Sequence, residues 1–173
     1  MNKIQEFITF LTNLSINIKG LEDNEIFLIL IDTDNFIECS IQFEKYMSSF
    51  LLNNVNSIQN DKMKRKQLIR KGLISILLTN ICQINRNELS FTYNEYGKPY
   101  ISQEINVGNH FFSVSYSDNY MLFSISKNNE IGVDVEVINN KRDHVRLVNR
   151  FASDKENSFF SLSSKKLKTQ KSL

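Results

Sequence analysis

The sequence predicts an α+β fold, because two hydrophobic periods divide the chain. Up to about residue 84 most apolar residues recur every three to four positions, which is the spacing of an amphipathic helix. Beyond residue 84 they alternate with polar residues, which is typical of strands. We therefore expect a helix-rich first half followed by an antiparallel meander, with no Gly-, Ser- or Pro-rich linker between them.

Three helices are expected in the first half. The first covers residues 4–14, and the second covers residues 41–52 and ends in an Asn-rich turn at 53–56. An apolar run at residues 25–31 lies between these two helices and predicts a buried strand. The third helix covers residues 61–81 and begins with a basic cluster: Lys62, Lys64, Arg65, Lys66, Arg70 and Lys71.

Period-two patterns predict four strands in the remainder, at residues 89–93, 111–115, 120–126 and 131–137. The first is followed by a tight loop at residues 94–99, which contains the only proline of the chain.

Two further helices are expected near the end of the chain. One covers residues 143–151, where apolar residues share one side. The other begins with Ser153, followed three residues later by Glu156, which is the pattern of a capping box.

Composition excludes several classes of protein. With 41% hydrophobic residues and a formal net charge of +2, the 173-residue chain has enough apolar surface to fold and too little positive charge for bulk nucleic-acid binding. No apolar run approaches the about 20 residues of a membrane-spanning helix, and no secretory cleavage pattern is present. Cys39 and Cys82 are too few for a disulfide framework, so we expect free, buried or half-buried thiols in a cytoplasmic protein with no nucleic-acid or membrane partner.

The segment Gly132-Val133-Asp134-Val135-Glu136 suggests a metal site. Side chains alternate along a strand, so Asp134 and Glu136 share one face, with their Cα atoms about 7 Å apart at roughly 3.3 Å of rise per residue. Both carboxylates can bind one Mg²⁺, which commonly takes one or two protein carboxylates and completes its shell with water and phosphate oxygens. The alternative is a half-buried strand with an ordinary polar face.

Three other features each allow two interpretations. The basic cluster at residues 62–71 is either a phosphate-binding surface or a solvated helix face. Residues 97–99 lack the spacing of a P-loop, so they form either a plain turn or a nucleotide contact made through the backbone. A row of serines shares one face of its strand and meets either a ligand or water: Ser113, Ser115 and Ser117.

Taken in order, these segments resemble the Sfp-type 4'-phosphopantetheinyl transferases, the superfamily of holo-acyl-carrier-protein synthase. A basic helix leads into LISIL at residues 73–77, and four motifs follow: NEYGKPYI at 94–101, FSVSYS at 112–117, IGVDVE at 131–136 and RFASDKE at 150–156. The IGVDVE motif is the most specific of these. The resemblance covers roughly residues 25–160 and implies two similar α+β halves related by a pseudo-twofold axis.

The resemblance also implies roles for eight residues. These are Lys66, Gly97, Lys98, Pro99, Ser115, Tyr116, Asp134 and Glu136. It assigns the last two to Mg²⁺ and catalysis, the loop at residues 97–99 to the adenine of coenzyme A, and Lys66, or its neighbour Arg65, to the 3'-phosphate. Ser115 and Tyr116 stand where the family has a Ser-His pair that contacts the phosphates of the coenzyme.

Two departures from the family pattern change these expectations. Tyr116 replaces a histidine, and a phenol hydroxyl donates a hydrogen bond but carries no positive charge, so phosphate affinity should fall unless another cation compensates. The family's W-x-x-K-E-x-x-x-K motif, which supplies a third acidic group and a lysine, has no counterpart in a sequence without tryptophan. We therefore expect a chain truncated at its C-terminus, with one α+β half at residues 1–130 and an incomplete second half at 131–173.

The function implied by the resemblance is transfer of the 4'-phosphopantetheine arm of coenzyme A to a serine of an acyl or peptidyl carrier protein. The reaction is expected to depend on Mg²⁺, and the activity of this chain is expected to be weak or lost. The partners are the carrier protein and coenzyme A, and the chain is expected to be a monomer. The alternatives are a non-catalytic protein that retains recognition of coenzyme A or of the carrier protein, and a plain domain without either property.

Overall fold

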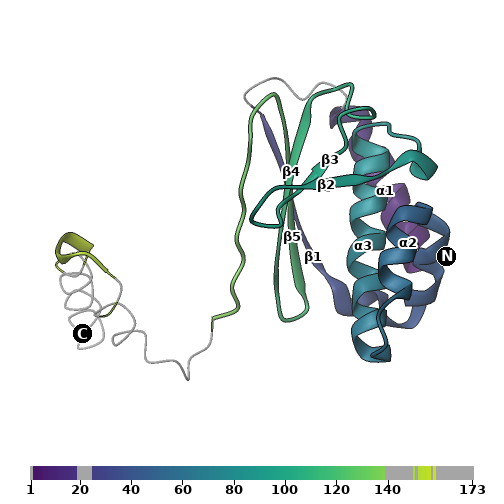
Figure 1. Cartoon of the computed structure of the whole chain (residues 1–173), viewed down its shortest axis with the longest axis horizontal. Coiled ribbons are helices and arrows are strands. Elements are labelled where there is room, and N and C mark those ends of the chain that lie inside the picture. The colour runs from purple at the N-terminus through teal and green to yellow at the C-terminus, as the bar shows by residue number, and fades with distance from the viewer. Residues whose placement is uncertain (1, 19–24, 139–149, 151, 157, 159–173) are drawn as a thin grey trace, which may run out of the picture. The chain divides into compact units, whose positions relative to one another are not determined.

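The computed structural model describes residues 2–18, 25–138, 150, 152–156 and 158. Contacts between Cα atoms divide the chain into two compact units, Met1–Glu136 and Val137–Leu173. The first unit contains a three-stranded antiparallel sheet and the helices that pack against it (Figure 1). This combination of helices and antiparallel strands confirms the predicted α+β class.

The first and third predicted helices are present and are capped by asparagines. Helix α1 is Lys3–Ile18, and its first turn is closed by the Asn2 side chain, whose Oδ1 accepts a hydrogen bond from the Ile4 N–H at 2.9 Å. Helix α3 is Asp61–Ile81, as predicted, and the Asn60 side chain accepts from the Met63 N–H at 2.9 Å. Each cap satisfies an N–H group that has no partner inside its helix.

The predicted helix at residues 41–52 is wrong, because the chain is interrupted near Ser48, and the turn expected at residues 53–56 is instead the end of a helix. A 3₁₀ helix, η1, is Thr33–Tyr46, and helix α2 is Ser49–Asn56. Met47 and Ser48 between them are extended, with ψ of 147° and 162°. The Ser48 hydroxyl donates to the Leu89 carbonyl at 2.6 Å and accepts from the Leu51 N–H, so it caps α2 instead of continuing a helix.

Replacing Ser48 by alanine should lower the free energy of unfolding by about 1 to 2 kcal/mol, because it removes both a helix cap and a buried hydrogen bond. Urea denaturation followed by circular dichroism measures this change. Ser49→Ala, next to Ser48 on the exposed side of α2, is the control and should leave the free energy within about 0.5 kcal/mol of wild type. Equal effects of the two substitutions would contradict the capping role.

The main sheet has the strand order β1-β5-β4, with both neighbours antiparallel. Strand β1 is Ile26–Asp32, β4 is His110–Ser117 and β5 is Tyr120–Lys127. A separate hairpin pairs β2, Phe91–Tyr93, with β3, Pro99–Ile101. The expected continuous meander is therefore wrong, because β1 pairs with β5 and the hairpin of β2 and β3 forms a sheet of its own. The predicted strands at residues 89–93, 111–115 and 120–126 are therefore present, the first shorter and the other two longer than expected. A short 3₁₀ turn, η2, Arg86–Glu88, precedes the hairpin.

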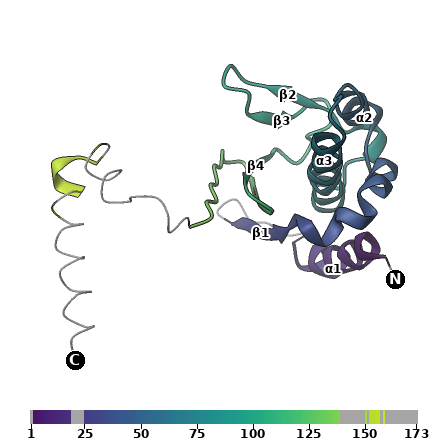
Figure 2. The same cartoon turned by 90° about the horizontal axis from the view of Figure 1, so that it is seen from below.

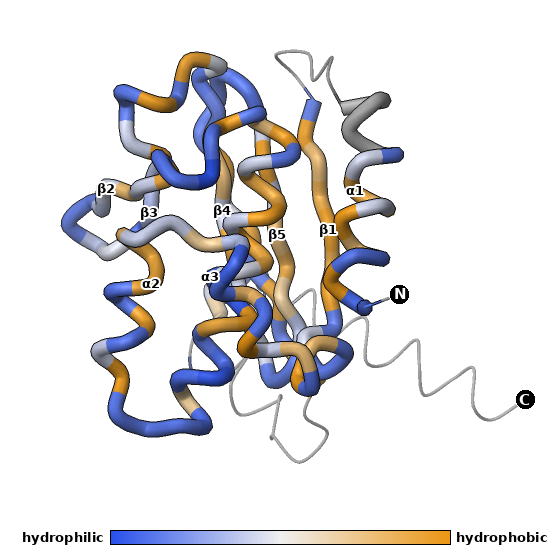
Figure 3. The backbone as a smooth tube through the Cα atoms, turned by 90° about the vertical axis from the view of Figure 1, so that its right-hand side faces the viewer, coloured by the Kyte–Doolittle hydropathy of each residue, from blue (hydrophilic) through white to orange (hydrophobic). Residues whose placement is uncertain are grey.

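Strand β1 was expected to be buried, and this is wrong for one of its faces. Ile26, Leu28 and Leu30 are between 55% and 61% exposed, whereas Ile31 is buried. The apolar run that predicted burial lies in an antiparallel sheet that the described helices cover on one face. β1 and β5 are nevertheless the most continuously apolar strands of the sheet (Figure 3).

Helix α3 lies between the sheet and α2 in both views and forms the centre of the core (Figures 1 and 2). Its residues Leu73, Leu77 and Leu78 are fully buried. Phe43 of η1 is also fully buried and crosses α3 at Gly72, where an added Cβ would lie 2.6 Å from both Cβ and Cγ of Phe43. A glycine at this point of α3 is therefore required for η1 to approach so closely.

The two cysteines are as the sequence predicts. Cys39 is buried and Cys82 half-buried, and both are free thiols, as expected.

The helix predicted at residues 143–151 falls outside the described residues, except for Arg150. The capping box is confirmed: the Ser153 N–H and hydroxyl both donate to Glu156 Oε2, at 2.8 and 2.7 Å, and these bonds hold the pKa of Glu156 below its usual range. In the part of the chain that the structure describes, no helix is long and apolar enough to cross a bilayer.

Candidate functional site

Residues 131–136 run alongside β4 without forming a regular strand, so the strand predicted at 131–137 is wrong in this respect (Figures 1 and 2). The Val133 N–H donates to the Ser113 hydroxyl at 3.2 Å, and the Val135 N–H donates to the Ser115 hydroxyl at 3.1 Å. Serine side chains of β4 thus take the place of the backbone carbonyls that a neighbouring strand would use. The serine row therefore meets this segment of the chain, and not simply a ligand or water.

Two of these serines also contact the carboxylates of the segment. The Ser115 hydroxyl donates to Asp134 Oδ1 at 2.7 Å, and the Ser117 hydroxyl donates to Glu136 Oε2 at 3.4 Å. Asp134 and Glu136 are exposed, while the valines between and beside them are partly buried. The structure therefore brings both carboxylates to one edge of β4, with the alternation that the sequence predicts.

The donor set of this edge suits a hard cation. Asp134 and Glu136 supply carboxylate oxygens, and Ser115 and Ser117 supply hydroxyl oxygens beside them. Oxygen donors from one or two carboxylates are the protein ligands that Mg²⁺ usually takes. Among the described residues, no three His, Cys, Asp or Glu side chains gather into one group.

The loop at residues 97–99 is joined to the beginning of the same segment. The Lys98 ammonium donates to the Ile131 carbonyl at 2.9 Å and lies 3.8 Å from a carboxylate oxygen of Glu130. Gly97 has φ of +78°, a conformation that glycine adopts without strain, and its N–H donates to the Asn94 carbonyl. Pro99 begins β3. The loop is thus a well-formed turn held against residues 130 and 131.

Lys66 and Arg65 lie elsewhere, in a hollow of about 380 Å³ between the start of α3 and the β4–β5 turn. Lys62 of α3 and Asp118 and Asn119 of the turn line the same hollow. Both alternatives for the basic residue therefore face one space. No hydrogen bond or ion pair links Lys66 to the 97–99 loop within the described residues, so the predicted coenzyme contacts form two separate groups.

Tyr116 lies on the opposite face of β4 from Ser115 and packs against α3. The guanidinium carbon of Arg70 is 3.9 Å from the centre of the Tyr116 ring, the distance of a cation–π contact. Burial raises the pKa of Tyr116 well above its usual value, and the charge of Arg70 opposes this rise only in part. Tyr116 therefore stays neutral, and the positive charge beside it comes from Arg70, a residue that the sequence placed only within a basic cluster.

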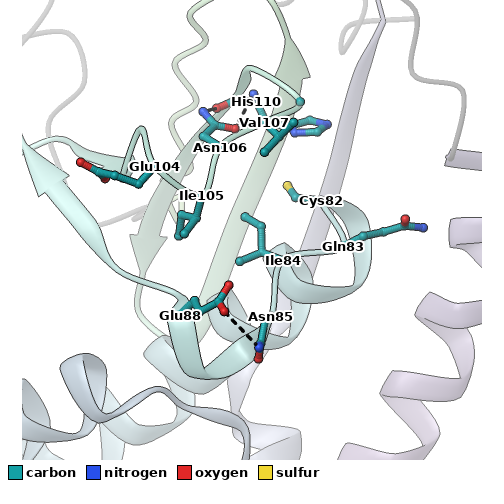
Figure 4. A pocket seen from close by; sticks show the side chains of 11 residues that line it. Cys82, Gln83, Ile84, Asn85, Glu88, Glu104, Ile105, Asn106, Val107 and His110 are labelled. Carbon is teal, nitrogen blue, oxygen red and sulfur yellow. Dashed lines mark hydrogen bonds between the residues drawn. The ribbon is translucent and has the colours of Figure 1, made fainter.

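A second hollow, of about 250 Å³, contains none of the predicted site residues (Figure 4). Its lining includes Cys82, His110 and Glu104. Burial raises the pKa of Cys82 to about 12, and burial together with the charge of Lys127 lowers the pKa of His110. Both groups are therefore neutral near pH 7, which makes the thiol a poor nucleophile.

Searches of known sequences return 4'-phosphopantetheinyl transferases. The chain is 26% identical over 146 residues to the 4'-phosphopantetheinyl transferase gsp of Aneurinibacillus migulanus, covering 73% of this chain and 59% of that protein. It is 28% identical over 114 residues to a putative 4'-phosphopantetheinyl transferase of Synechocystis, covering 66% of this chain and 46% of that protein. The predicted resemblance to this superfamily is thereby confirmed, and the chain spans about half the length of the curated relatives it matches.

No family model matches the chain. Among solved structures, a holo-ACP synthase from Plasmodium yoelii aligns with a TM-score of 0.44 and 16% sequence identity, covering 63% of this chain and 99% of that one.

Proposed function

We propose that this chain transfers the 4'-phosphopantetheine arm of coenzyme A to a serine of an acyl or peptidyl carrier protein, with weak activity. The observation that carries the proposal is the pair of exposed carboxylates, Asp134 and Glu136, held beside β4 by the hydroxyls of Ser115 and Ser117. The names of the relatives support the same reaction. In it, the serine oxygen of the carrier bonds to the β-phosphorus while the bond from this phosphorus to the bridging oxygen breaks. Adenosine 3',5'-bisphosphate leaves, and the proton of the serine hydroxyl passes to the surrounding water.

Asp134 and Glu136 would hold Mg²⁺. When bound, this ion would neutralise negative charge on the diphosphate as the bond to the leaving group breaks. Neighbouring residues of this chain then have to hold the two carboxylate groups in the orientation that binds the ion. The Ser115 hydroxyl does so at Asp134, since its single hydrogen is donated to Oδ1 while its oxygen accepts from the Val135 N–H. We therefore propose that Ser115 positions Asp134.

The other residues would bind the coenzyme. Lys66, or Arg65 in the same hollow, would bind the 3'-phosphate through charge-assisted hydrogen bonds. The turn formed by Gly97, Lys98 and Pro99 would lie against the adenine, with Lys98 held in place by the Ile131 carbonyl. We also propose that the chain consists of two similar halves, residues 1–130 and an incomplete second half at 131–173, and that it is a monomer.

The test is to incubate the full chain with coenzyme A, Mg²⁺ and an apo carrier protein and to follow the mass of the carrier. We expect the mass increase of one phosphopantetheine arm, which disappears when the acceptor serine of the carrier is replaced by alanine. Chelation of the divalent cation should also abolish it. An unmodified carrier under all conditions would contradict the transferase proposal.

A second candidate is a binding protein that recognises coenzyme A without turning it over. The observation that favours it is the small acidic set, since only two carboxylates gather at the site within the described part of the chain. Calorimetry separates the two candidates: binding of coenzyme A with no change in the carrier mass would favour the binding protein.

A further inference from the structure

Arg70 carries a positive charge that no acidic group pairs with among the residues that the structure describes. The side chain is half-buried between α3 and β4, with its guanidinium over the Tyr116 ring. It forms no salt bridge with any described residue, and its Nε is buried without a hydrogen-bond partner. Burying a charge in this way is costly unless an opposite charge or further hydrogen bonds compensate it.

Arg70 comes directly after Ile69 on α3, and Ile69 lines the hollow at the start of this helix. Arg70 follows Lys66 by four residues on α3, so the two side chains project from the same side of the helix. Lys66 and Ile69 line the hollow, as does Asp118, which follows Tyr116 by two residues. Arg70 thus follows directly on residues of a hollow whose lining carries three cations, Lys62, Arg65 and Lys66. Two carboxylates, Asp34 and Asp118, also line it, so the cations are in excess by one.

A guanidinium in this setting is suited to a phosphate. Burial lowers the pKa of Arg70, with Tyr116 opposing this, but an arginine remains protonated in proteins. Its planar fork presents several N–H donors, which match the oxygens of a phosphate, and a flat aromatic ring below it fixes the plane of the fork. A bound phosphate would supply both the missing negative charge and acceptors for the unused donors.

We propose that Arg70, oriented by the ring of Tyr116, binds a phosphate group of coenzyme A. This inference rests on the proposed function, because it assumes that coenzyme A is the ligand. It adds a binding residue that the sequence motifs did not identify, and it provides a cation at the position where Tyr116 itself carries no charge. Both the 3'-phosphate and the diphosphate of the coenzyme have the required chemistry.

The test is calorimetric titration of the full-length chain and of Arg70→Met with three probes: coenzyme A, 3'-dephospho-coenzyme A and pantetheine. We expect Arg70→Met to weaken binding of coenzyme A about 10- to 100-fold, as for the loss of hydrogen bonds to a charged group. Binding of pantetheine, which has no phosphate, should not change. A loss restricted to coenzyme A assigns Arg70 to the 3'-phosphate, and a loss that extends to the dephospho form assigns it to the diphosphate.

Arg86→Met is the matched control, because Arg86 lies in η2 and donates to the Lys45 carbonyl, away from the hollow. It should leave all three affinities unchanged. Should Arg70→Met fail to fold, as judged by circular dichroism, Arg70→Lys takes its place and should weaken coenzyme A less while leaving pantetheine unaffected.

Two results would overturn the inference alone: a wild-type affinity for coenzyme A in the folded Arg70 variant, or an equal loss for coenzyme A and pantetheine. The first would mean that the contact with Tyr116 is only structural, and the second that the variant is generally perturbed. A wild-type chain that binds no coenzyme A would instead overturn the proposed function, and this inference with it.

Discussion

Replacing Asp134 by asparagine is expected to lower the rate of phosphopantetheine transfer about 100- to 1000-fold, the typical effect of removing one electrostatic stabiliser from an active site. Asparagine keeps the size of the side chain, and its amide oxygen can still accept the hydrogen bond from the Ser115 hydroxyl. What is lost is the negative charge that would bind Mg²⁺. The rate of carrier modification, measured by mass spectrometry at fixed coenzyme A and Mg²⁺ concentrations, gives the effect.

The matched control is Glu44→Gln, which removes one carboxylate charge from an exposed position of η1. Its rate should equal that of the wild type, and both variants should unfold at wild-type urea concentrations because neither carboxylate is buried. A wild-type transfer rate in Asp134→Asn, with an active wild-type enzyme beside it, would show that Asp134 has no part in the reaction.

Helix α3 could be predicted from sequence because several local signals agree there. Its apolar residues Ile69, Leu73, Ile76 and Leu77 recur at helical spacing, and residues 61–71 before and among them hold charged residues that suit an exposed helix start. The interruption at Ser48 could not be predicted in the same way. It depends on a hydrogen bond to Leu89, 41 residues further along the chain, and local periodicity contains no information on such a contact.

The candidate site also has a part that the sequence could predict and a part that it could not. The exposure of Asp134 and Glu136 follows from the alternation of the segment, which any extended chain with one covered face produces. The bonds from Ser115 and Ser117 to these carboxylates depend on how residues 131–136 dock on β4. Arg70 was hidden within a run of cations, and only its contact with Tyr116, 46 residues later, distinguishes it from its neighbours.

Replacing Phe43 by alanine is expected to lower the free energy of unfolding by about 3 to 5 kcal/mol. The ring is fully buried, its centroid lies 5.7 Å from the centroid of the Phe36 ring, and it packs against α3 at Gly72. Neighbouring atoms can close the resulting cavity only in part, because Gly72 has no side chain to enter it. Urea denaturation of the wild type and the variant, with the slope of the transition compared between them, gives the difference in free energy.

Ile41→Ala separates burial from helix propensity. Ile41 lies two residues before Phe43 in η1 but is 73% exposed, so both substitutions place an alanine in the same helix while only one removes a buried side chain. We expect Ile41→Ala to change the free energy of unfolding by less than about 0.5 kcal/mol. Similar costs at the two positions would mean that η1 is stabilised by its local conformation, and that Phe43 does not anchor it to α3.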